Sequence, residues 1–248
     1  MLPKPNTFST AEDFRNGCIL LIDKPLDWTS FDVVNKVRYI IRKDLGFKKI
    51  KVGHAGTLDP KATGLLVLCT GKMTKQIQFF TNDAKTYTGT FFIGATRPSF
   101  DLETEIDQHY PIELITEDLL REAAQKMSGK ILQTPPAFSA KKVDGVRSYK
   151  AARAGKNLEL KPVEVEIFEF ELTRIALPEV DFRIKCSKGT YIRSMAFDFG
   201  ALLNSGAYLQ ALRRTESGDF KMDDGCTIET LKSQISQLEP LPEEGLAK

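Results

Sequence analysis

The stretch Gly53-His54-Ala55-Gly56-Thr57-Leu58-Asp59-Pro60 is the most informative part of the chain. Its two glycines allow the backbone to approach a ligand closely. A carboxylate directly before a proline is kept out of the helical region of backbone space. The stretch therefore predicts a loop that presents Asp59 from an extended or turn conformation. From these residues alone, Asp59 is either a functional carboxylate or an acceptor of hydrogen bonds within the turn.

The segments before and after this loop predict two strands and a helix. Cys18–Ile22 and Leu65–Thr70 are short apolar runs typical of buried strands. Pro25 ends the first strand, because proline cannot continue the pairing. Thr29 or Ser30 can cap a helix, since apolar residues then recur at helical spacing.

The second half of the chain alternates between strand and helix patterns. Strands are expected at Tyr87–Gly94, Val163–Leu172 and Val180–Cys186, and helices within Thr74–Phe80, Pro111–Ser128 and Tyr191–Leu203. The apolar face changes parity at Ile167–Phe168, which indicates a β-bulge. This irregular order favours an α+β fold with a mixed, largely antiparallel sheet.

The charge of the chain is unevenly distributed. The 35 Lys and Arg residues against 33 Asp and Glu give a net charge of only +2. Arg42–Lys75 nevertheless has eight basic residues against two acidic ones, and Lys141–Lys156 has six against one. Two basic segments indicate a surface for a polyanion such as nucleic acid. The alternative is that both segments are solvated helix and loop faces.

Several classes of site and location are not expected. The four cysteines are far apart and form no C-x-x-C pair, which indicates free thiols in a reducing compartment. With two histidines, a metal site is not expected. No apolar run approaches the ~20 residues of a membrane helix. Because the chain also lacks an apolar leader and a glycine-rich phosphate loop, we expect a cytoplasmic protein without a nucleotide cofactor.

Five motifs, in order and at similar spacing, resemble the TruB family of tRNA pseudouridine synthases. They are Leu21–Pro25 (L-I-D-K-P), Gly53–Pro60 continued by Ala62–Gly64, Lys85–Tyr87 (K-T-Y), Cys186–Arg193 (C-S-K-G-T-Y-I-R) and Leu212–Arg214 (L-R-R). On these motifs the chain is identified as a member of that family. The resemblance implies the pseudouridine synthase fold and an isomerase that converts uridine 55 in the T arm of tRNA to pseudouridine, without a metal or organic cofactor.

The resemblance also implies roles for individual residues. Asp59 matches the family's essential aspartate, Tyr87 the aromatic that stacks on the extruded base, and Arg193 the residue that pairs with the aspartate. Substrate contacts are implied for His54, Tyr191, Leu212, Lys24 and Asp101. His54 matches the residue that fills the space left by the base, and the surroundings of Asp101 depart from the family pattern. Extruding a base costs a few kcal/mol, which stacking of about 1–3 kcal/mol offsets.

Residues 134–156 resemble the RNA-gripping insertion of the family, with Lys141 and Lys142 as phosphate contacts. Many members also carry a carboxy-terminal PUA domain, for which residues 218–248 are too few and too acidic. We therefore expect a catalytic domain over residues 1–217 and a short acidic extension over residues 218–248.

Two alternatives stay open. The first is a non-catalytic RNA-binding or tRNA-remodelling protein that keeps this fold, and the second is a pseudouridine synthase that acts on another RNA. The intact Asp59, Tyr87 and Arg193 argue against the first, because a pure binder has no need of a carboxylate facing phosphates.

Overall fold

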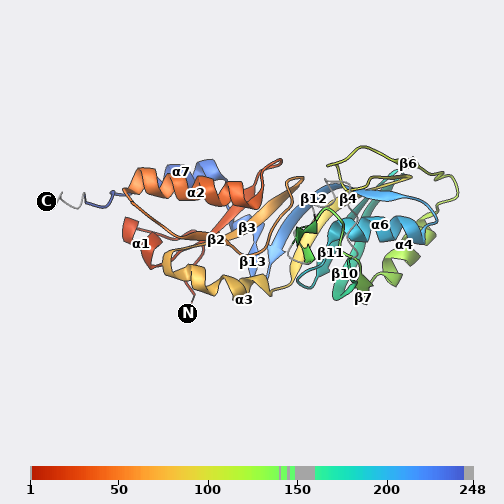
Figure 1. The fold of residues 1–248 in the computed structure, drawn as a ribbon, viewed down its shortest axis with the longest axis horizontal. Coiled ribbons are helices and arrows are strands. Elements are labelled where there is room, and N and C mark those ends of the chain that lie inside the picture. Colours follow the sequence, from red (N-terminus) through yellow and green to blue (C-terminus); the bar gives the residue numbers. More distant parts are fainter. Residues whose placement is uncertain (1, 140, 144–145, 149–159, 243–248) are drawn as a thin grey trace. The chain divides into compact units, whose positions relative to one another are not determined.

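A computed structural model describes residues 2–139, 141–143, 146–148 and 160–242, which fall into two units (Figure 1). Unit 1 comprises Met1–Asp83 and Arg213–Lys248, and unit 2 comprises Ala84–Leu212. Unit 1 is therefore built from both ends of the chain, whereas unit 2 is one continuous segment.

Unit 1 is organised around the strand β3 (Ala62–Thr70). It pairs antiparallel with β1 (Ile19–Lys24) and with β2 (Val52–His54). Alternate residues of β1 enter two different cores, because successive side chains of a strand point to opposite faces. The helical segments of unit 1 are α1 (Ala11–Asn16), α2 (Ser30–Leu45), the 3-10 helix η1 (Gly71–Gln76), α3 (Ile77–Thr81), the 3-10 helix η2 (Met222–Asp224) and α7 (Ile228–Ile235).

The helix α2 begins where the sequence predicts. Thr29 caps it: the hydroxyl accepts from the backbone N–H of Asp32 at 3.0 Å, and the Asp32 carboxylate accepts from the N–H of Thr29 at 2.9 Å. This reciprocal pair is a capping box. The helix ends at Gly46, whose φ of +75° suits glycine.

The segment after Ser217 contributes to the core of unit 1. Ile228, Leu231 and Ile235 of α7 are buried in the same cluster as the apolar face of α2, and the two helices lie side by side (Figure 1). The domain boundary expected at Ser217 stays a prediction, but the described part of the acidic segment is packed against the rest of unit 1.

Unit 2 contains a largely antiparallel sheet. The strand order is β12, β4, β11, β10 and β7, and the pairs from β4 to β7 are antiparallel. The strands are β4 (Lys85–Ile93), β7 (Gly129–Gln133), β10 (Val163–Ala176), β11 (Glu179–Cys186) and β12 (Ala207–Ser217); the helices are α4 (Glu117–Lys126) and α6 (Ile192–Leu202). Two further pairs of two-residue strands are antiparallel. The strand β5 (Ala95–Thr96) pairs with β6 (Gln108–His109), and β8 (Lys142–Val143) pairs with β9 (Val146–Arg147).

The strand β12 belongs to both units. Its residues up to Leu212 are part of unit 2, where it neighbours β4. Its residues from Arg213 are part of unit 1, where it neighbours β3 and pairs with β13 (Phe220–Lys221). The residues Leu212–Arg214, which the sequence singled out, therefore lie where the chain passes from one unit to the other.

The predicted α+β fold and the predicted β-bulge are confirmed. The register between β10 and β11 shifts between Ile167 and Glu169, so Phe168 is the extra residue, and its side chain is 52% exposed. The strand β2 was not predicted, because its three residues are too few to show a period. None of the helices in the described ranges has the length and apolar character needed to cross a membrane.

Gly64 is a position where the backbone requires glycine. Its φ is +97°, and an added Cβ would lie 2.3 Å from the carbonyl oxygen of Arg214 and 2.8 Å from its nitrogen. We expect Gly64→Ala to lower the melting temperature by about 4 °C or more, since overpacking alone costs about 1–3 kcal/mol. Gly129→Ala is the control, because Gly129 has φ +82° but nothing within 4 Å of the added carbon. Equal thermal shifts for both variants would show that the contact with Arg214 contributes nothing.

Candidate functional site

Asp59 lies in the loop between β2 and β3, and the first residue of α2 fixes the residue before it. The Ser30 hydroxyl accepts a hydrogen bond from the N–H of Leu58 at 2.8 Å and donates one to its carbonyl oxygen at 3.0 Å. The carbonyl oxygen of Asp59 accepts from the N–H of Ala62 at 3.1 Å, which leads the chain into β3. Asp59 is half-buried. The loop is therefore held in one conformation around its carboxylate.

Arg214 supports the same loop from the opposite end of the sequence. Its side chain is 1% exposed, and its guanidinium donates to the carbonyl oxygens of Leu65 at 2.7 Å, Gly56 at 3.1 Å and Thr57 at 3.5 Å. The planar guanidinium offers several donors at once, which suits it to joining a loop to a strand. Sequence reasoning noted Arg214 in a motif but assigned it no role, because its partners lie about 150 residues earlier.

Lys24 is a third support of the loop. It is completely buried, and its ammonium donates to the carbonyl oxygens of Trp28 at 2.6 Å, Pro25 at 2.8 Å and Pro60 at 3.4 Å. Burial lowers the pKa of Lys24 to about 8, while attraction to the nearby Asp59 carboxylate acts in the opposite direction. This placement differs from the expected substrate contact, because an ammonium enclosed by carbonyl oxygens has no donor on the surface.

His54 ends β2 and lies next to the same loop. It pairs with Leu68 across β3 and is half-buried. Burial is the main effect that lowers the pKa of His54, and the charge of Arg214 adds to it. The imidazole is therefore neutral near pH 7, a state that can pack against a nucleobase. Unit 1 thus brings together three of the predicted site residues, Lys24, His54 and Asp59.

Arg193 is the buried cation of unit 2. It lies in the first turn of α6 and its side chain is 5% exposed. The guanidinium donates to the carbonyl oxygens of Phe138 at 3.0 Å and Ser99 at 3.3 Å. Its Nε lies 3.6 Å from a carboxylate oxygen of Asp101, whose side chain is also 5% exposed.

The ion pair with Asp101 supplies an anion that the position of Arg193 requires. A cation in the first turn of a helix gains nothing from the helix dipole. Asp101 compensates it from within the same unit, and its other carboxylate oxygen accepts from the N–H of Glu103 at 2.9 Å. Asp59 belongs to unit 1, so its pairing with Arg193 stays a prediction.

Three further predicted site residues belong to unit 2. Tyr191 precedes α6, where the buried Gln133 holds its backbone by two hydrogen bonds, from Tyr191 N at 2.8 Å and to Tyr191 O at 3.1 Å. Tyr87 is 9% exposed in β4, opposite Ile184 of β11. Leu212 is half-buried in β12. No pattern in the sequence pointed to Gln133, because its partner lies 58 residues later.

The expected RNA-gripping insertion is described only in part. Lys141 is half-buried, and its carbonyl oxygen accepts from the N–H of Ser148 at 2.8 Å. Lys142 begins β8, which pairs with β9. Residues 140, 144–145 and 149–156 of the insertion lie outside the described residues, so its role stays a prediction.

Asp198 lies one and a half turns after Arg193 on α6, and burial raises its pKa to about 6. A raised carboxyl pKa contributes stability that is present below the unfolded value near 3.8 and is lost as the pH rises through 6. We expect Asp198→Asn to stabilise the protein above pH 6 by about 1–2 kcal/mol and not at pH 4. Thermal unfolding between pH 4 and 7.5 measures this, with Asp219→Asn as an exposed control. A difference in melting temperature that does not change with pH would contradict it.

Two models of known protein families match the segments of the chain that contain nearly all of the candidate site residues. Residues 42–192 match the TruB family pseudouridylate synthase model (N terminal domain), and residues 193–246 match the tRNA pseudouridylate synthase B C-terminal domain. The chain is 55% identical over 227 residues to the tRNA pseudouridine synthase B of Flavobacterium johnsoniae, which covers 91% of this chain and 99% of that protein. It is 54% identical to the protein of the same name from Phocaeicola vulgatus, over 92% and 97% of the two chains.

Solved structures show the same fold. The chain is similar to a protein in a crystal structure of a Cbf5-Nop10-Gar1 complex, with a TM-score of 0.68 and 26% identity over 93% of this chain. It is similar to a chain of the archaeal box H/ACA sRNP Nop10-Cbf5 complex, with a TM-score of 0.65 and 26% identity over 90% of its length. It spans 59% and 54% of those two solved chains.

Proposed function

The chain belongs to the TruB family of pseudouridylate synthases, and from that premise we propose that it converts uridine 55 in the T arm of tRNA to pseudouridine. Pseudouridine synthesis on tRNA is the activity of its relatives of about 50% identity, which match it over nearly their whole length. The proposal adds two points to this activity: the target is uridine 55, and the enzyme recognises the T arm of the tRNA.

The reaction needs a positioned carboxylate more than any other group. Pseudouridine is an isomer of uridine: the bond from ribose to ring nitrogen 1 breaks, a bond to ring carbon 5 forms, and the proton on carbon 5 is lost as nitrogen 1 gains one. Asp59 acts on the nucleoside to start this exchange. We assign Tyr87 as the residue that stacks on the extruded base and takes part in the proton transfer at carbon 5.

The observation that carries the proposal is the way unit 1 holds the Asp59 loop. Ser30, Arg214 and Lys24 fix Leu58, Gly56 and Pro60 by hydrogen bonds between 2.8 and 3.4 Å. All of these bonds involve the backbone of the loop or its flanks, so the backbone position from which Asp59 projects is fixed in advance. A reacting group held in advance avoids the entropic cost of being ordered during the reaction.

Arg193 and the basic insertion complete the proposed site. We assign Arg193 as the cation that pairs with Asp59 when the base is bound, because its fork is already oriented by the carbonyls of Ser99 and Phe138. Lys141 and Lys142 contact backbone phosphates, and His54 fills the space of the extruded base. The four free cysteines fit a reducing compartment, and we place the enzyme in the cytoplasm with its tRNA substrate.

The experiment is incubation of purified protein with an unmodified tRNA transcript, without added cofactor, followed by chemical mapping of pseudouridine. We expect modification at uridine 55 alone. A transcript with cytidine at position 55 and an isolated T-arm hairpin are the controls, and the hairpin should still be modified. Modification elsewhere in the tRNA would contradict the assignment of the T arm. Binding without any modification would favour a non-catalytic RNA-binding protein.

A further inference from the structure

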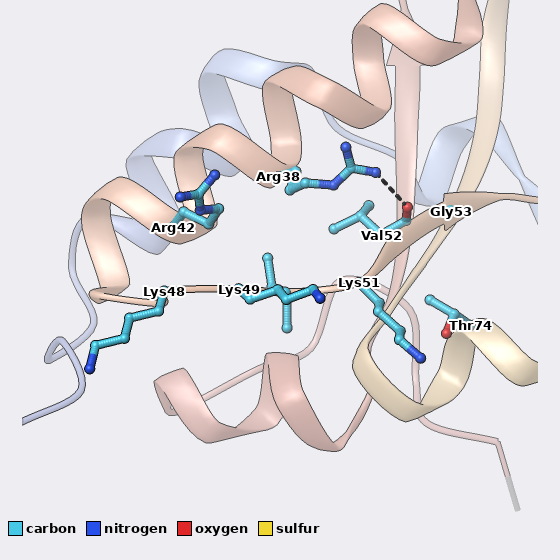
Figure 2. A pocket seen from close by; sticks show the side chains of 9 residues that line it. Arg38, Arg42, Lys48, Lys49, Lys51, Val52, Gly53 and Thr74 are labelled. Atoms are coloured by element: carbon cyan, nitrogen blue, oxygen red, sulfur yellow. Dashed lines mark hydrogen bonds between the residues drawn. The ribbon is translucent and has the colours of Figure 1, made fainter. Parts of the chain in front are cut away.

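A strongly basic pocket lies in unit 1, outside the Asp59 loop (Figure 2). The cavity has a volume of about 480 Å³, and five of the nine residues that line it are cationic: Arg38, Arg42, Lys48, Lys49 and Lys51. None of the nine is acidic. We refer to these five residues as the basic pocket.

The fold gathers these charges from two segments. Arg38 and Arg42 are one turn apart on the same face of α2, because residues four apart are neighbours on a helix. After Gly46 the chain runs back toward β2, and Figure 2 shows Lys48, Lys49 and Lys51 along this returning segment, across the cavity from the two arginines. The basic pocket therefore depends on the length and direction of the connection from α2 to β2.

One of the five cations is set in place by hydrogen bonds. The Arg38 guanidinium donates to the carbonyl oxygen of Val52 at 3.1 Å and to the side chain of Asn35 at 2.9 Å. It is half-buried, whereas the other four side chains belong to exposed residues. An anion that enters thus finds one guanidinium held by hydrogen bonds and four cations on solvent-exposed residues.

The charge and openness of the pocket identify the class of ligand. Gathering five like charges raises the electrostatic potential in a hollow, which attracts an anion and raises its local concentration. Arginine forks and lysine ammonium groups are the groups that proteins use for phosphate. An open hollow with exposed rims fits a chain of phosphates that passes through it, since small ligands are usually enclosed on most of their surface.

The position of the basic pocket relative to Asp59 indicates which part of an RNA would supply the phosphates. Val52 and Gly53 line the cavity, the next residue is His54, and Asp59 lies six residues beyond Gly53 in the same unit. Six residues span at most roughly 20 Å, which is less than one turn of a nucleic acid duplex, about 34 Å. A stem whose loop reaches Asp59 is therefore long enough to extend as far as the pocket.

We propose that the basic pocket binds backbone phosphates of the RNA stem next to the loop that carries the target uridine. This rests on the proposed function, and it adds a second anchoring point, separate from residues 134–156, that sets the register of the stem relative to Asp59. Phosphate contacts position a nucleic acid without reading its sequence.

The test compares two variants of equal charge. The pocket variant is Arg42→Gln, Lys49→Gln and Lys51→Gln, which keeps the structural Arg38. The control variant is Lys36→Gln, Lys43→Gln and Lys232→Gln, three exposed cations of unit 1 that do not line the cavity. The dissociation constant for a T-arm hairpin is measured for each at several salt concentrations, together with KM and kcat.

We expect the pocket variant to bind the hairpin at least tenfold more weakly and the control variant within about twofold of the wild type. The slope of log affinity against log salt should fall by about 2 for the pocket variant, because each lost phosphate contact removes about 0.7–0.9. The loss should be in KM rather than in kcat. Equal losses in the two variants, or an unchanged salt slope in the pocket variant, would overturn the proposal.

A second hairpin locates the contact on the RNA. When neutral methylphosphonates replace the stem phosphates, the wild type should lose affinity and the pocket variant should lose little more, because the two changes remove the same interaction. Additive losses would place the pocket's ligand elsewhere, for example on an acidic protein, and would overturn the proposal. These binding results stand apart from catalysis: a wild type that binds in this way but forms no pseudouridine would contradict the proposed function alone.

Discussion

Asp59→Asn is expected to abolish pseudouridine formation while the affinity for tRNA stays within about tenfold of the wild type. The amide is nearly isosteric with the carboxylate but cannot act as a nucleophile or a base. Affinity is retained because most of it comes from phosphate and shape contacts. The loop should keep its conformation, since Ser30, Lys24 and Arg214 hold backbone atoms of the loop that the substitution leaves unchanged. Single-turnover assays and filter binding measure the two effects.

Asp27→Asn is the matched control for this substitution. Asp27 is an exposed carboxylate of the same unit that pairs with Lys61 at 2.7 Å, and its N–H donates to the carbonyl oxygen of Pro60. Its φ is +63°, which asparagine tolerates well. We expect the control to keep nearly full activity. Turnover above a few per cent of wild type in Asp59→Asn, with deamidation excluded, would overturn the assignment of Asp59.

Arg193→Met is expected to produce the second largest loss. Arg193 and Asp101 are both almost fully buried, and removing one partner of a buried pair costs about 3–5 kcal/mol. The carbonyls of Ser99 and Phe138 also lose a donor. We expect most activity near neutral pH to disappear. Part of it should return at higher pH if Arg193 also pairs with Asp59, because a carboxylate without its cation holds its proton more tightly.

Two further variants separate charge from geometry at this position. Arg193→Lys should be more active than Arg193→Met but less active than the wild type, because lysine lacks the second nitrogen with which Arg193 approaches Asp101 while Nη1 contacts the two carbonyls. Arg174→Met removes an exposed arginine of the same unit, which pairs with Glu179 and Asp181, and should leave turnover unchanged. Pseudouridine formation is measured from pH 6 to 9, with thermal unfolding to confirm folding. Near-wild-type turnover of Arg193→Met at neutral pH would contradict the proposed pairing of Arg193 with Asp59.

The sequence predicted those parts of the fold that depend on short-range patterns. The cap at Thr29 needs only neighbouring residues, and the bulge at Phe168 follows from a change of parity within one strand. The motif around Asp59 was visible because proline and glycine constrain their neighbours. Each of these signals lies within about ten residues of chain.

The supports of the site could not be predicted, because they join distant residues. Arg214 holds a loop that lies some 150 residues earlier, and Gln133 holds the backbone of Tyr191. The family resemblance implies a substrate contact for Lys24. In the structure three carbonyl oxygens enclose its ammonium. Only the three-dimensional arrangement distinguishes these two uses of a cation.

The division of unit 1 between the two ends of the sequence sets an order of events during synthesis on the ribosome. The strand that carries Arg214 and the helix α7 are translated only after the whole of unit 2, about 130 residues beyond Asp83. At about 5–20 residues per second, this interval lasts roughly 6 to 26 seconds. Throughout that time the Asp59 loop lacks its guanidinium support and the core of unit 1 lacks α7. The Asp59 loop is therefore translated long before the arginine that supports it, and it can reach its final conformation only as one of the last folding steps of the chain.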